Sequence, residues 1–193
     1  MIRLCLSLLL SLACLPATAA LQVFATAPEW AALAREIGGD KVSIYTATTA
    51  LQDIHRITAK PSLLAQARRA QLVVATGAEL EIGWLPVVLR DSGNAGIQPG
   101  QSGYFEAARY VTLLDVPAVL DRAQGDVHAA GNPHIQLDPR NFFRIGEALA
   151  ARMGELDPPN AAAYQAGYKA FAEKWRAAIA RWEKEAAPLR GVP

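Results

Sequence analysis

Residues 21–46 read LQVFATAPEWAALAREIGGDKVSIYT, and the order of apolar residues in this stretch decides the fold. The segment Leu21–Ala25 is largely apolar and is expected to form a strand. Residues 28–37 have a helical composition, and the two glycines that follow are a helix stop. Val42–Thr46 alternates and is rich in β-branched residues, so it is expected as a second strand. A strand, a helix and a strand at this spacing predict a βαβ unit with parallel strands.

The chain beyond this unit continues the alternation of strands and helices. Ser62 is expected to cap a helix that runs through Arg69, and Leu72–Thr76 is a short apolar run that predicts a buried strand. Further along, we expect a helix bent at Pro86, a short strand and an amphipathic helix, at residues 80–89, 111–114 and 139–153. The sequence therefore predicts an α/β fold with a parallel sheet.

The first residues have the composition of a secretory signal peptide. The start is basic, residues 4–15 are apolar and rich in leucine, and Ala17-Thr18-Ala19 supplies a small-x-small cleavage site. We expect cleavage after the last of these residues, so that residues 1–19 are removed and the mature chain is periplasmic. The alternative is a lipoprotein anchored through Cys14, which is less favoured because Ser11 stands where a lipobox carries leucine.

The cysteine content and the net charge limit which metal ligands and binding partners the mature chain can have. The chain has two cysteines, Cys5 and Cys14, and both lie within the predicted signal peptide. The mature chain therefore offers neither a disulfide nor a thiolate metal site, and a metal would have to be bound by imidazole and carboxylate. The formal net charge falls from +1 to 0 with the loss of Arg3, which excludes a general electrostatic attraction to nucleic acid or acidic membranes.

Three histidines are the candidate metal ligands: His55, His128 and His134. All of them lie in predicted loops, and a single loop histidine is most often a solvated surface residue. Binding sites in open parallel sheets gather at the carboxyl ends of the strands, where the loops carrying His55 and His134 are expected to converge. Glu79 and Glu81 follow the buried strand at the same edge. The alternative for both is a solvated carboxylate near a helix start.

The segment GNPHIQLDP, residues 131–139, holds His134 in a stiff loop. A proline precedes the histidine, and Asp138-Pro139 follows as a helix-start pair. The aspartate can cap the first turn, and the proline lacks an N–H that would need a partner. His128 could reach the same ion, or the bend at residues 131–133 could point the two rings apart.

Four segments of the chain form a combination that is more specific than any one of them: IGGDKV, residues 37–42; DIH, residues 53–55, with KPS, residues 60–62; LVVATGAELE, residues 72–81, with WLP, residues 84–86; and GDVH, residues 125–128, with GNPHIQLDP. Together they resemble the substrate-binding proteins of metal ABC importers of the zinc/manganese type. The resemblance implies two α/β lobes joined by one long helix, with the metal between the lobes. It implies that His55 and His134 are metal ligands and that His128 lies beside the site as a secondary candidate. Glu79 is a further secondary candidate because it follows the buried strand at the same edge.

Two residues depart from the pattern of that family. Ile54 replaces the usual proline before the first ligand, which predicts a less fixed loop around His55. Gln136 replaces an aromatic residue, usually tryptophan, which predicts looser packing near His134.

The end of the chain predicts one long helix. Residues 157–187 begin with Asp-Pro and carry one apolar stripe at three- and four-residue steps: Tyr164, Tyr168, Phe171, Trp175, Ile179 and Trp182. By the resemblance, residues 20–156 are an N-terminal metal-binding lobe, residues 157–187 are the connecting helix, and residues 188–193 start a second lobe. That lobe is otherwise absent, so we expect a truncated protein. Without it, the stripe from Trp175 to Trp182 is expected to be partly exposed.

The resemblance implies a periplasmic substrate-binding protein, without enzymatic activity, that captures a divalent metal ion for an ABC permease in the inner membrane. Zn²⁺ is the preferred cargo and Mn²⁺ the second, because imidazole suits zinc whereas manganese sites use more carboxylate. One alternative is a zinc hydrolase that binds its metal through the three histidines, with Glu79 as the base. Another is a non-transporting relic or adhesin of the same fold.

Overall fold

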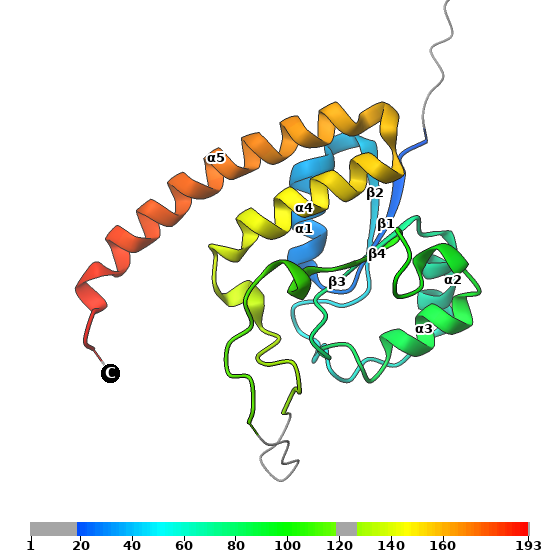
Figure 1. Cartoon of the computed structure of the whole chain (residues 1–193), viewed down its shortest axis with the longest axis horizontal. Helices are drawn as coiled ribbons and strands as arrows, with labels where there is room; N and C mark the ends of the chain where they lie inside the picture. Colours follow the sequence, from blue (N-terminus) through cyan, green and yellow to red (C-terminus); the bar gives the residue numbers. More distant parts are fainter. Residues whose placement is uncertain (1–18, 119–126, 193) are drawn as a thin grey trace, which may run out of the picture.

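The computed structural model describes residues 19–118 and 127–192, and its centre is a parallel sheet of four strands (Figure 1). The strands are β1 (Leu21–Ala25), β2 (Val42–Thr46), β3 (Leu72–Ala75) and β4 (Tyr104–Glu106). Their order in the sheet is β2-β1-β3-β4, and each neighbouring pair is parallel. The predicted α/β fold class with a parallel sheet is confirmed.

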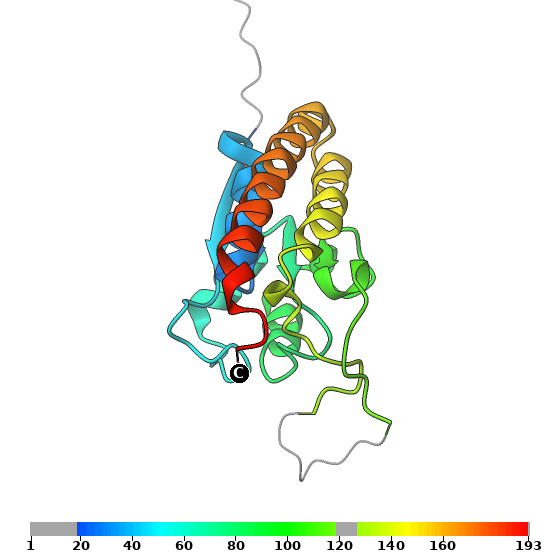
Figure 2. The same cartoon turned by 90° about the vertical axis from the view of Figure 1, so that its left-hand side faces the viewer.

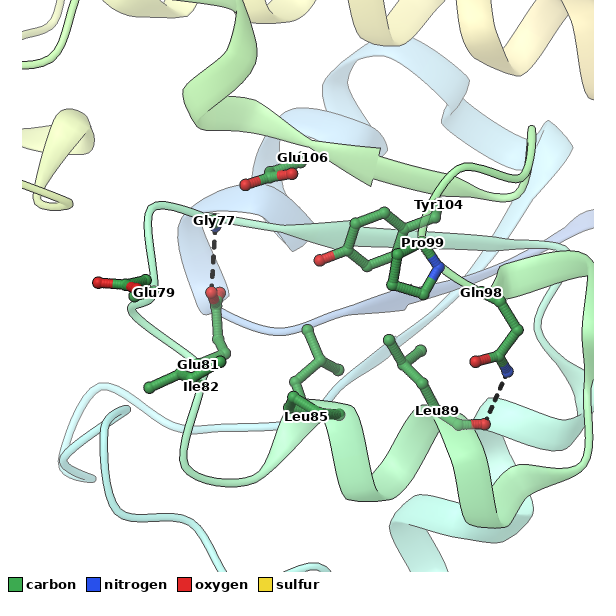
Figure 3. A pocket seen from close by; sticks show the side chains of 11 residues that line it. Gly77, Glu79, Glu81, Ile82, Leu85, Leu89, Gln98, Pro99, Tyr104 and Glu106 are labelled. Atoms are coloured by element: carbon green, nitrogen blue, oxygen red, sulfur yellow. Dashed lines mark hydrogen bonds between the residues drawn. The ribbon is translucent and has the colours of Figure 1, made fainter. Parts of the chain in front are cut away.

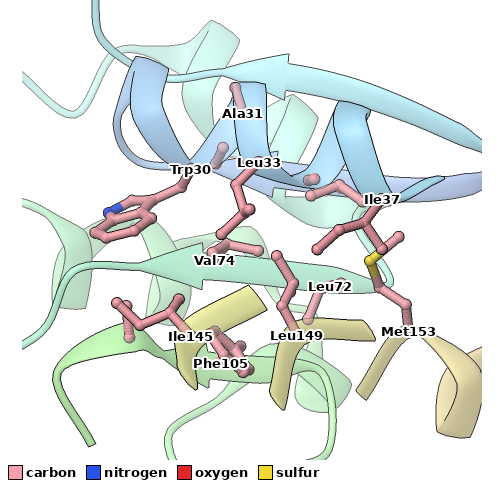
Figure 4. Packing of buried hydrophobic residues seen from close by; sticks show 14 of the residues in the cluster. Trp30, Ala31, Leu33, Ile37, Leu72, Val74, Phe105, Ile145, Leu149 and Met153 are labelled. Atoms are coloured by element: carbon pink, nitrogen blue, oxygen red, sulfur yellow. The ribbon is translucent and has the colours of Figure 1, made fainter. Parts of the chain in front are cut away.

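Helices cover both faces of this sheet: α1 (Pro28–Gly38), α2 (Pro61–Arg69), α3 (Leu85–Ser92), α4 (Asn141–Leu156) and α5 (Ala161–Ala186). The side chains of β3 alternate between two apolar layers. Leu72 and Val74 pack with α1 and α4 (Figure 4), whereas Val73 and Ala75 pack with α2 and α3. A strand buried on both faces needs this continuous apolar run, because successive side chains point to opposite sides of the sheet.

The predicted βαβ unit is confirmed in the structure. Strand β1 pairs with β2 from Leu21 opposite Val42 to Ala25 opposite Thr46. Pro28 opens α1, and Gly39 follows its end with a φ of 54°, a left-handed conformation that favours glycine. The proline and the glycine recognised in the sequence therefore lie at the two ends of α1.

The bounds of α2 and α3 correct two predictions. Pro61 begins α2 with Lys60 at the cap position, so Ser62 is not the cap. Helix α3 begins at Leu85, which puts Pro86 in its first turn, where a proline needs no hydrogen-bond partner and does not bend the helix. Turns occupy the residues between Glu79 and the start of α3.

The fourth strand, β4, is not the apolar run at residues 111–114 that the sequence predicted. Residues 104–106 pair with Val73–Ala75 and so occupy the sheet position beside β3. The predicted run instead follows a 3-10 helix, Ala107–Tyr110, and packs two of its apolar side chains against the core without forming a strand. The apolar residues at 111–114 were therefore correctly expected to be buried. The strand beside β3 is formed by residues 104–106 instead.

The long helix α5 lies alongside α4 and α1 (Figures 1 and 2). A 3-10 turn, Pro158–Asn160, leads into it. Its first turns complete the core, since Tyr164 is fully buried and its hydroxyl donates to Asp157 Oδ2 at 2.6 Å. Gly167 allows the close approach of α5 to α1, because a Cβ at this position would collide with the backbone carbonyl of Ile37.

The apolar stripe of α5 becomes more exposed toward its end. Trp175 is half-buried, and its Nε1 donates to the Pro139 carbonyl at 2.7 Å. Trp182 is 38% exposed, whereas Ile179 between them is buried. The predicted exposure is therefore confirmed for Trp182 and wrong for Ile179, because α5 still packs against the lobe at that position.

Residues 1–18 of the predicted signal peptide lie outside the residues that the structure describes. Cys14 is one of them. Within the two ranges that the structure describes, no helix combines the length and the apolar character that crossing a bilayer requires.

The strand order positions a binding site. The chain leaves β1 toward β2 and leaves β3 toward β4, so the connections diverge between the two central strands. In open α/β sheets, the crevice at such a switch point, at the carboxyl ends of the strands, is where ligands bind. The loop that follows β2 carries His55, and the turn that follows β3 carries Glu79.

Candidate metal site

The structure brings the three histidines together. The ring centroid of His55 lies 5.6 Å from that of His128 and 5.7 Å from that of His134. A tetrahedral zinc ion, with Zn–N bonds of about 2.0–2.1 Å, holds two imidazole centroids about 5 Å apart. The rings are therefore close to the spacing of imidazoles that share one ion. The loops of His55 and His134 meet, as the sequence predicted.

Asp53 orients the ring of His55. Its Oδ1 accepts from the His55 backbone N–H at 3.0 Å and lies 2.8 Å from His55 Nδ1. The hydrogen bond from His55 holds the pKa of Asp53 below its usual value, so this carboxylate is ionised and Nδ1 carries the proton. His55 Nε2 is buried and has no hydrogen-bond partner among the described residues. A carboxylate behind one ring nitrogen and a lone pair on the other is the usual arrangement of a metal-binding histidine.

The loop of His55 is held by the turn that follows β3. The Trp84 indole Nε1 donates to the Ile54 carbonyl at 2.8 Å. Gly83 is required beside it, because a Cβ there would lie 2.9 Å from the His55 carbonyl oxygen. The Ile54 side chain packs against both apolar layers. The sequence predicted a less fixed loop from the loss of proline at this position, and these contacts replace the stiffness that a proline ring would supply.

A compact turn holds His134. Its backbone N–H donates to Asn132 Oδ1 at 3.0 Å, and the Asn132 backbone N–H donates to the Leu114 carbonyl at 2.8 Å. Gly131 has a φ of 113°, and a Cβ there would lie 2.6 Å from the same carbonyl oxygen. Glycine is therefore needed where the turn passes the segment around Leu114.

The residues after His134 start α4. Asp138 Oδ1 accepts from the Arg140 backbone N–H at 2.9 Å, which is the predicted helix-start contact, and α4 begins at the next residue. Gln136 Oε1 is buried and has no hydrogen-bond partner in the described part of the chain. A buried polar atom left unsatisfied costs about 1–3 kcal/mol. The looser packing near His134 that the sequence predicted from Gln136 stays a prediction.

Glu79 supports the segment that carries His128. Ala78 and Glu79 have positive φ angles of 49° and 68°, a conformation that is uncommon for residues other than glycine. In this conformation Glu79 Oε2 accepts from the Ala129 backbone N–H at 2.8 Å. The turn after β3 is thereby joined to the loop of His128, and the carboxylate of Glu79 is engaged in that contact.

Glu81 belongs to the framework of the site. It is buried, and it accepts from Thr26 Oγ1 at 2.7 Å, which links the ends of β1 and β3. The backbone N–H groups of Thr76 and Gly77 donate to the same carboxylate at 2.8 and 3.1 Å. Burial raises the pKa of Glu81 despite these hydrogen bonds. The alternative of a solvated carboxylate is therefore wrong for Glu81.

Asp115 is a site residue that the sequence analysis missed. With all three histidines it lines a surface cavity of about 340 Å³. Its φ is 52°, and Asn132 Nδ2 donates to its Oδ2 at 3.4 Å. The signal was present as Asp-Val-Pro, residues 115–117, because this is a turn-forming sequence directly after an apolar run. The apolar run at residues 111–114 favours a strand, and a strand continuing there would leave Asp115 out of the site.

These residues do not complete a coordination shell by themselves. Within residues 19–118 and 127–192, no group of three or more His, Cys, Asp or Glu side chains is arranged to hold a metal ion. The arrangement offers one fully oriented imidazole, His55, with two further imidazoles beside it. It can therefore supply part of a metal site at the carboxyl edge of the sheet.

A second cavity, of about 430 Å³, lies between α3 and β4 (Figure 3). Leu85 and Leu89 form its apolar side. Three carboxylates also line it: Glu79, Glu81 and Glu106. Glu106 accepts from Arg109 Nε at 2.8 Å, so each of the three carboxylates has a protein partner. These carboxylates hold the turn after β3 in place.

Known proteins resemble this chain over most of its length. The family model described as zinc-uptake complex component A, periplasmic, matches residues 23–192. The manganese ABC transporter substrate-binding lipoprotein scaA of Streptococcus gordonii is 25% identical over 157 residues, which are 80% of this chain and 47% of that protein. The metal ABC transporter substrate-binding lipoprotein SloC of Streptococcus mutans is 25% identical over 176 residues, which are 88% of this chain and 54% of that protein. The chain spans about half the length of the curated relatives it matches.

Solved structures share the fold. A zinc-bound deletion mutant of ZnuA matches with a TM-score of 0.66 and 25% identity over 81% of this chain and 55% of that chain. The metal-dependent lipoprotein YcdH from Bacillus subtilis matches with a TM-score of 0.68 and 19% identity over 86% and 56% of the two chains. The resemblance inferred from the sequence motifs is confirmed. Because the family model covers most of its residues, this chain belongs to the family of the periplasmic component A of zinc-uptake complexes, the substrate-binding proteins of metal ABC transporters.

Proposed function

We propose that this chain binds a divalent transition metal ion through His55 and His134 and delivers it to an ABC permease of metal uptake. The environment of His55 carries the proposal. Asp53 holds one ring nitrogen at 2.8 Å, and the other nitrogen has no hydrogen-bond partner within the described residues. The ring of His134 lies beside it, at 5.7 Å between centroids. Capture and release of an ion require coordination only, which this geometry can supply.

Zinc is the cargo that this donor set favours. Imidazole nitrogens suit zinc, whereas manganese sites draw mainly on carboxylates, carbonyls and water. The matched proteins do not decide the metal, because one relative is named for manganese and the solved structures include zinc-, manganese- and cadmium-bound forms. The choice of zinc therefore rests on the side chains of this chain.

Titration calorimetry of the mature chain, residues 20–193, with Zn²⁺ and with Mn²⁺ tests this choice. We expect zinc to bind at least about tenfold more tightly, because nitrogen donors bind zinc more strongly than manganese. Tighter binding of manganese would reassign the cargo. If neither metal bound, the proposed function would be lost.

The hydrolase alternative has less support from this geometry. It requires Glu79 to act as a general base on a metal-bound water, yet Glu79 Oε2 accepts a hydrogen bond from Ala129 at 2.8 Å. The family that the chain matches is one of substrate-binding proteins. We assign Glu79 a positioning role, and His128 stays a secondary donor beside the ion.

The domain limits are part of the proposal. Residues 20–156 would form the metal-binding lobe and residues 157–187 the helix that leads from it, since α5 follows directly after a 3-10 turn at Pro158–Asn160. The chain spans about half the length of its curated relatives. Transport by the whole protein and its contact with a permease are therefore proposed from the family.

We also propose that the chain is exported. The sequence favours a mature N-terminus at Ala20, whereas the curated relatives are named lipoproteins, which favours attachment through Cys14. Mass spectrometry of the protein from the cell envelope tests the proposal. A free Ala20 or a diacylglyceryl-modified Cys14 at the N-terminus would each demonstrate export, and a chain that keeps Met1 in the cytoplasm would refute it.

A further inference from the structure

A buried polar network joins the carboxyl ends of β1, β2 and β3, at the edge of the sheet that carries the candidate metal site. Thr26 follows β1, and its hydroxyl donates to Glu81 Oε1 at 2.7 Å. The backbone N–H groups of Thr76 and Gly77, which follow β3, donate to the same carboxylate (Figure 3). Thr48 lies two residues after β2, and its hydroxyl donates to the Thr26 carbonyl at 2.7 Å. The side chains of this network are at most 4% exposed, so water does not compete for these hydrogen bonds.

The network reaches the loop of His55 at two points. At the start of the loop, the hydrogen bond of Thr48 fixes the chain where it leaves the sheet. At the histidine itself, the connection runs through the backbone of Glu81, whose carbonyl accepts from the Trp84 backbone N–H at 3.1 Å. The Trp84 indole then donates to the carbonyl of Ile54, the residue directly before His55. The position of Glu81 therefore determines where this loop is held.

We propose that Glu81 is a positioning residue for metal binding, which fixes the loop of His55 in its metal-binding conformation before the ion arrives. The inference rests on the proposed function and adds a residue that acts through others, because three protein donors already occupy its carboxylate. Donor atoms have to be held within about 0.5 Å of their productive positions by the residues behind them. A loop that is loose in the free protein must be ordered on binding, which lowers the affinity.

The network requires an acceptor on both oxygen atoms of residue 81. Glu81 Oε1 accepts from the Thr26 hydroxyl and the Thr76 N–H, and Oε2 accepts from the Gly77 N–H at 3.1 Å. A carboxylate can accept on both sides, whereas a glutamine amide would place a donor against one of these groups. Glu81→Gln therefore keeps the size of the side chain and breaks part of the network.

The zinc affinity of the Glu81→Gln chain tests the inference, measured by competition with a chromogenic chelator. We expect a loss of about tenfold, the lower end of the range for groups that support metal ligands. Thr26→Val is a second, milder variant, because it removes one hydroxyl donor and preserves the shape of the side chain. It should lower the zinc affinity in the same direction by a smaller factor.

Asn94→Ala is the matched control, because Asn94 makes a comparable connection at the opposite edge of the sheet. Its side chain donates to three backbone carbonyls at the end of α2, just before β3 begins, and the shortest of these bonds is 2.8 Å, to Ala70. We expect this variant to lower Tm as Glu81→Gln does. Its zinc affinity should stay within about twofold of the unmodified chain, since distant sites act independently.

Hydrogen exchange of the chain in chelator measures the position of the loop without the metal. The Arg56 backbone N–H donates to the Asp53 carbonyl at 3.1 Å, which closes the turn that carries His55. The Arg56 amide should exchange faster in Glu81→Gln than in the unmodified chain, because the turn opens more often. It should exchange at an unchanged rate in the Asn94→Ala control.

The outcomes separate this inference from the proposed function. Suppose that Glu81→Gln and Thr26→Val lowered Tm but bound zinc as tightly as the unmodified chain. Glu81 would then have a structural role only, and the inference would be refuted while zinc binding remained. An equal loss of zinc affinity in Asn94→Ala would also refute it, because the effect would follow from lower stability alone. If the unmodified chain bound no zinc, the proposed function itself would fail.

Discussion

Replacing His55 or His134 with alanine is expected to lower the zinc affinity of the mature chain by about 100-fold or more. Structural zinc sites with four ligands are worth about 10–16 kcal/mol, or about 2.5–4 kcal/mol for each ligand, and 1.4 kcal/mol is a tenfold change in affinity. His55 is the better oriented of the two, because Asp53 fixes its tautomer and leaves Nε2 available. Competition with a chromogenic chelator measures both affinities.

A graded series connects this loss to the geometry of the site. Asp53→Asn keeps the shape but removes the charge behind His55, so it should weaken zinc binding by about 10- to 100-fold. Asp40→Asn is the matched control, because Asp40 pairs with Lys41 at 3.0 Å on the exposed turn before β2. His128→Ala should cost less than either ligand substitution. Unchanged affinity in both the His55 and His134 variants would refute their assignment as ligands.

Gly167→Ala is expected to destabilise the protein by about 2 kcal/mol or more, although alanine is intrinsically the better helix former by about 1 kcal/mol. The added Cβ would collide with the Ile37 carbonyl. A backbone atom cannot rotate away as a side chain does, so α5 would have to move off α1. Thermal unfolding should show a decrease in Tm of about 4–8 °C for a protein of this size.

Gly154→Ala in α4 is the matched control for that substitution. The nearest atom to a Cβ at Gly154 is the Ala161 methyl carbon at 3.1 Å, which lies at the start of a neighbouring helix. Its stability should stay within about 1 kcal/mol of the unmodified protein, since the helix propensity of alanine offsets the tighter contact. Equal Tm values for the two variants would show that α5 can move away from α1 without a loss of stability.

The sequence predicted the first half of the sheet well, because that half depends on local signals. The apolar runs of β1 and β2 and the proline and glycine at the ends of α1 lie within residues 21–46, and each acts on its immediate neighbours. Strand β4 was missed because a strand is defined by its partner. Tyr104 and Phe105 favour a strand, but a run of three residues is too short to show an alternating pattern, and it becomes a strand by pairing with β3.

The candidate site was predictable to a similar degree. His55 and His134 could be named because strand order brings their loops to one edge of the sheet. Asp-Val-Pro at residues 115–117 indicates a turn, but the place of Asp115 beside the histidines follows only from its left-handed backbone conformation. The contact of Glu79 with Ala129 depends on the same kind of conformation at Ala78 and Glu79. The motifs therefore identified candidate donors, and the backbone geometry determined which neighbours contact them.

The position of α5 against α1 sets the order in which this lobe can fold during its synthesis. The Tyr164 hydroxyl lies 3.4 Å from the Lys41 carbonyl across 123 residues of chain, and Lys174 pairs with Glu36 at 2.6 Å across 138 residues. A ribosome adds about 5–20 residues per second, so α1 waits roughly 6–25 s for the helix that covers it. During that interval the part of α1 that α5 covers is open to other molecules, although the strands and α4 are made earlier and contact α1 as well. The core closes only after residues beyond Lys174 have been made.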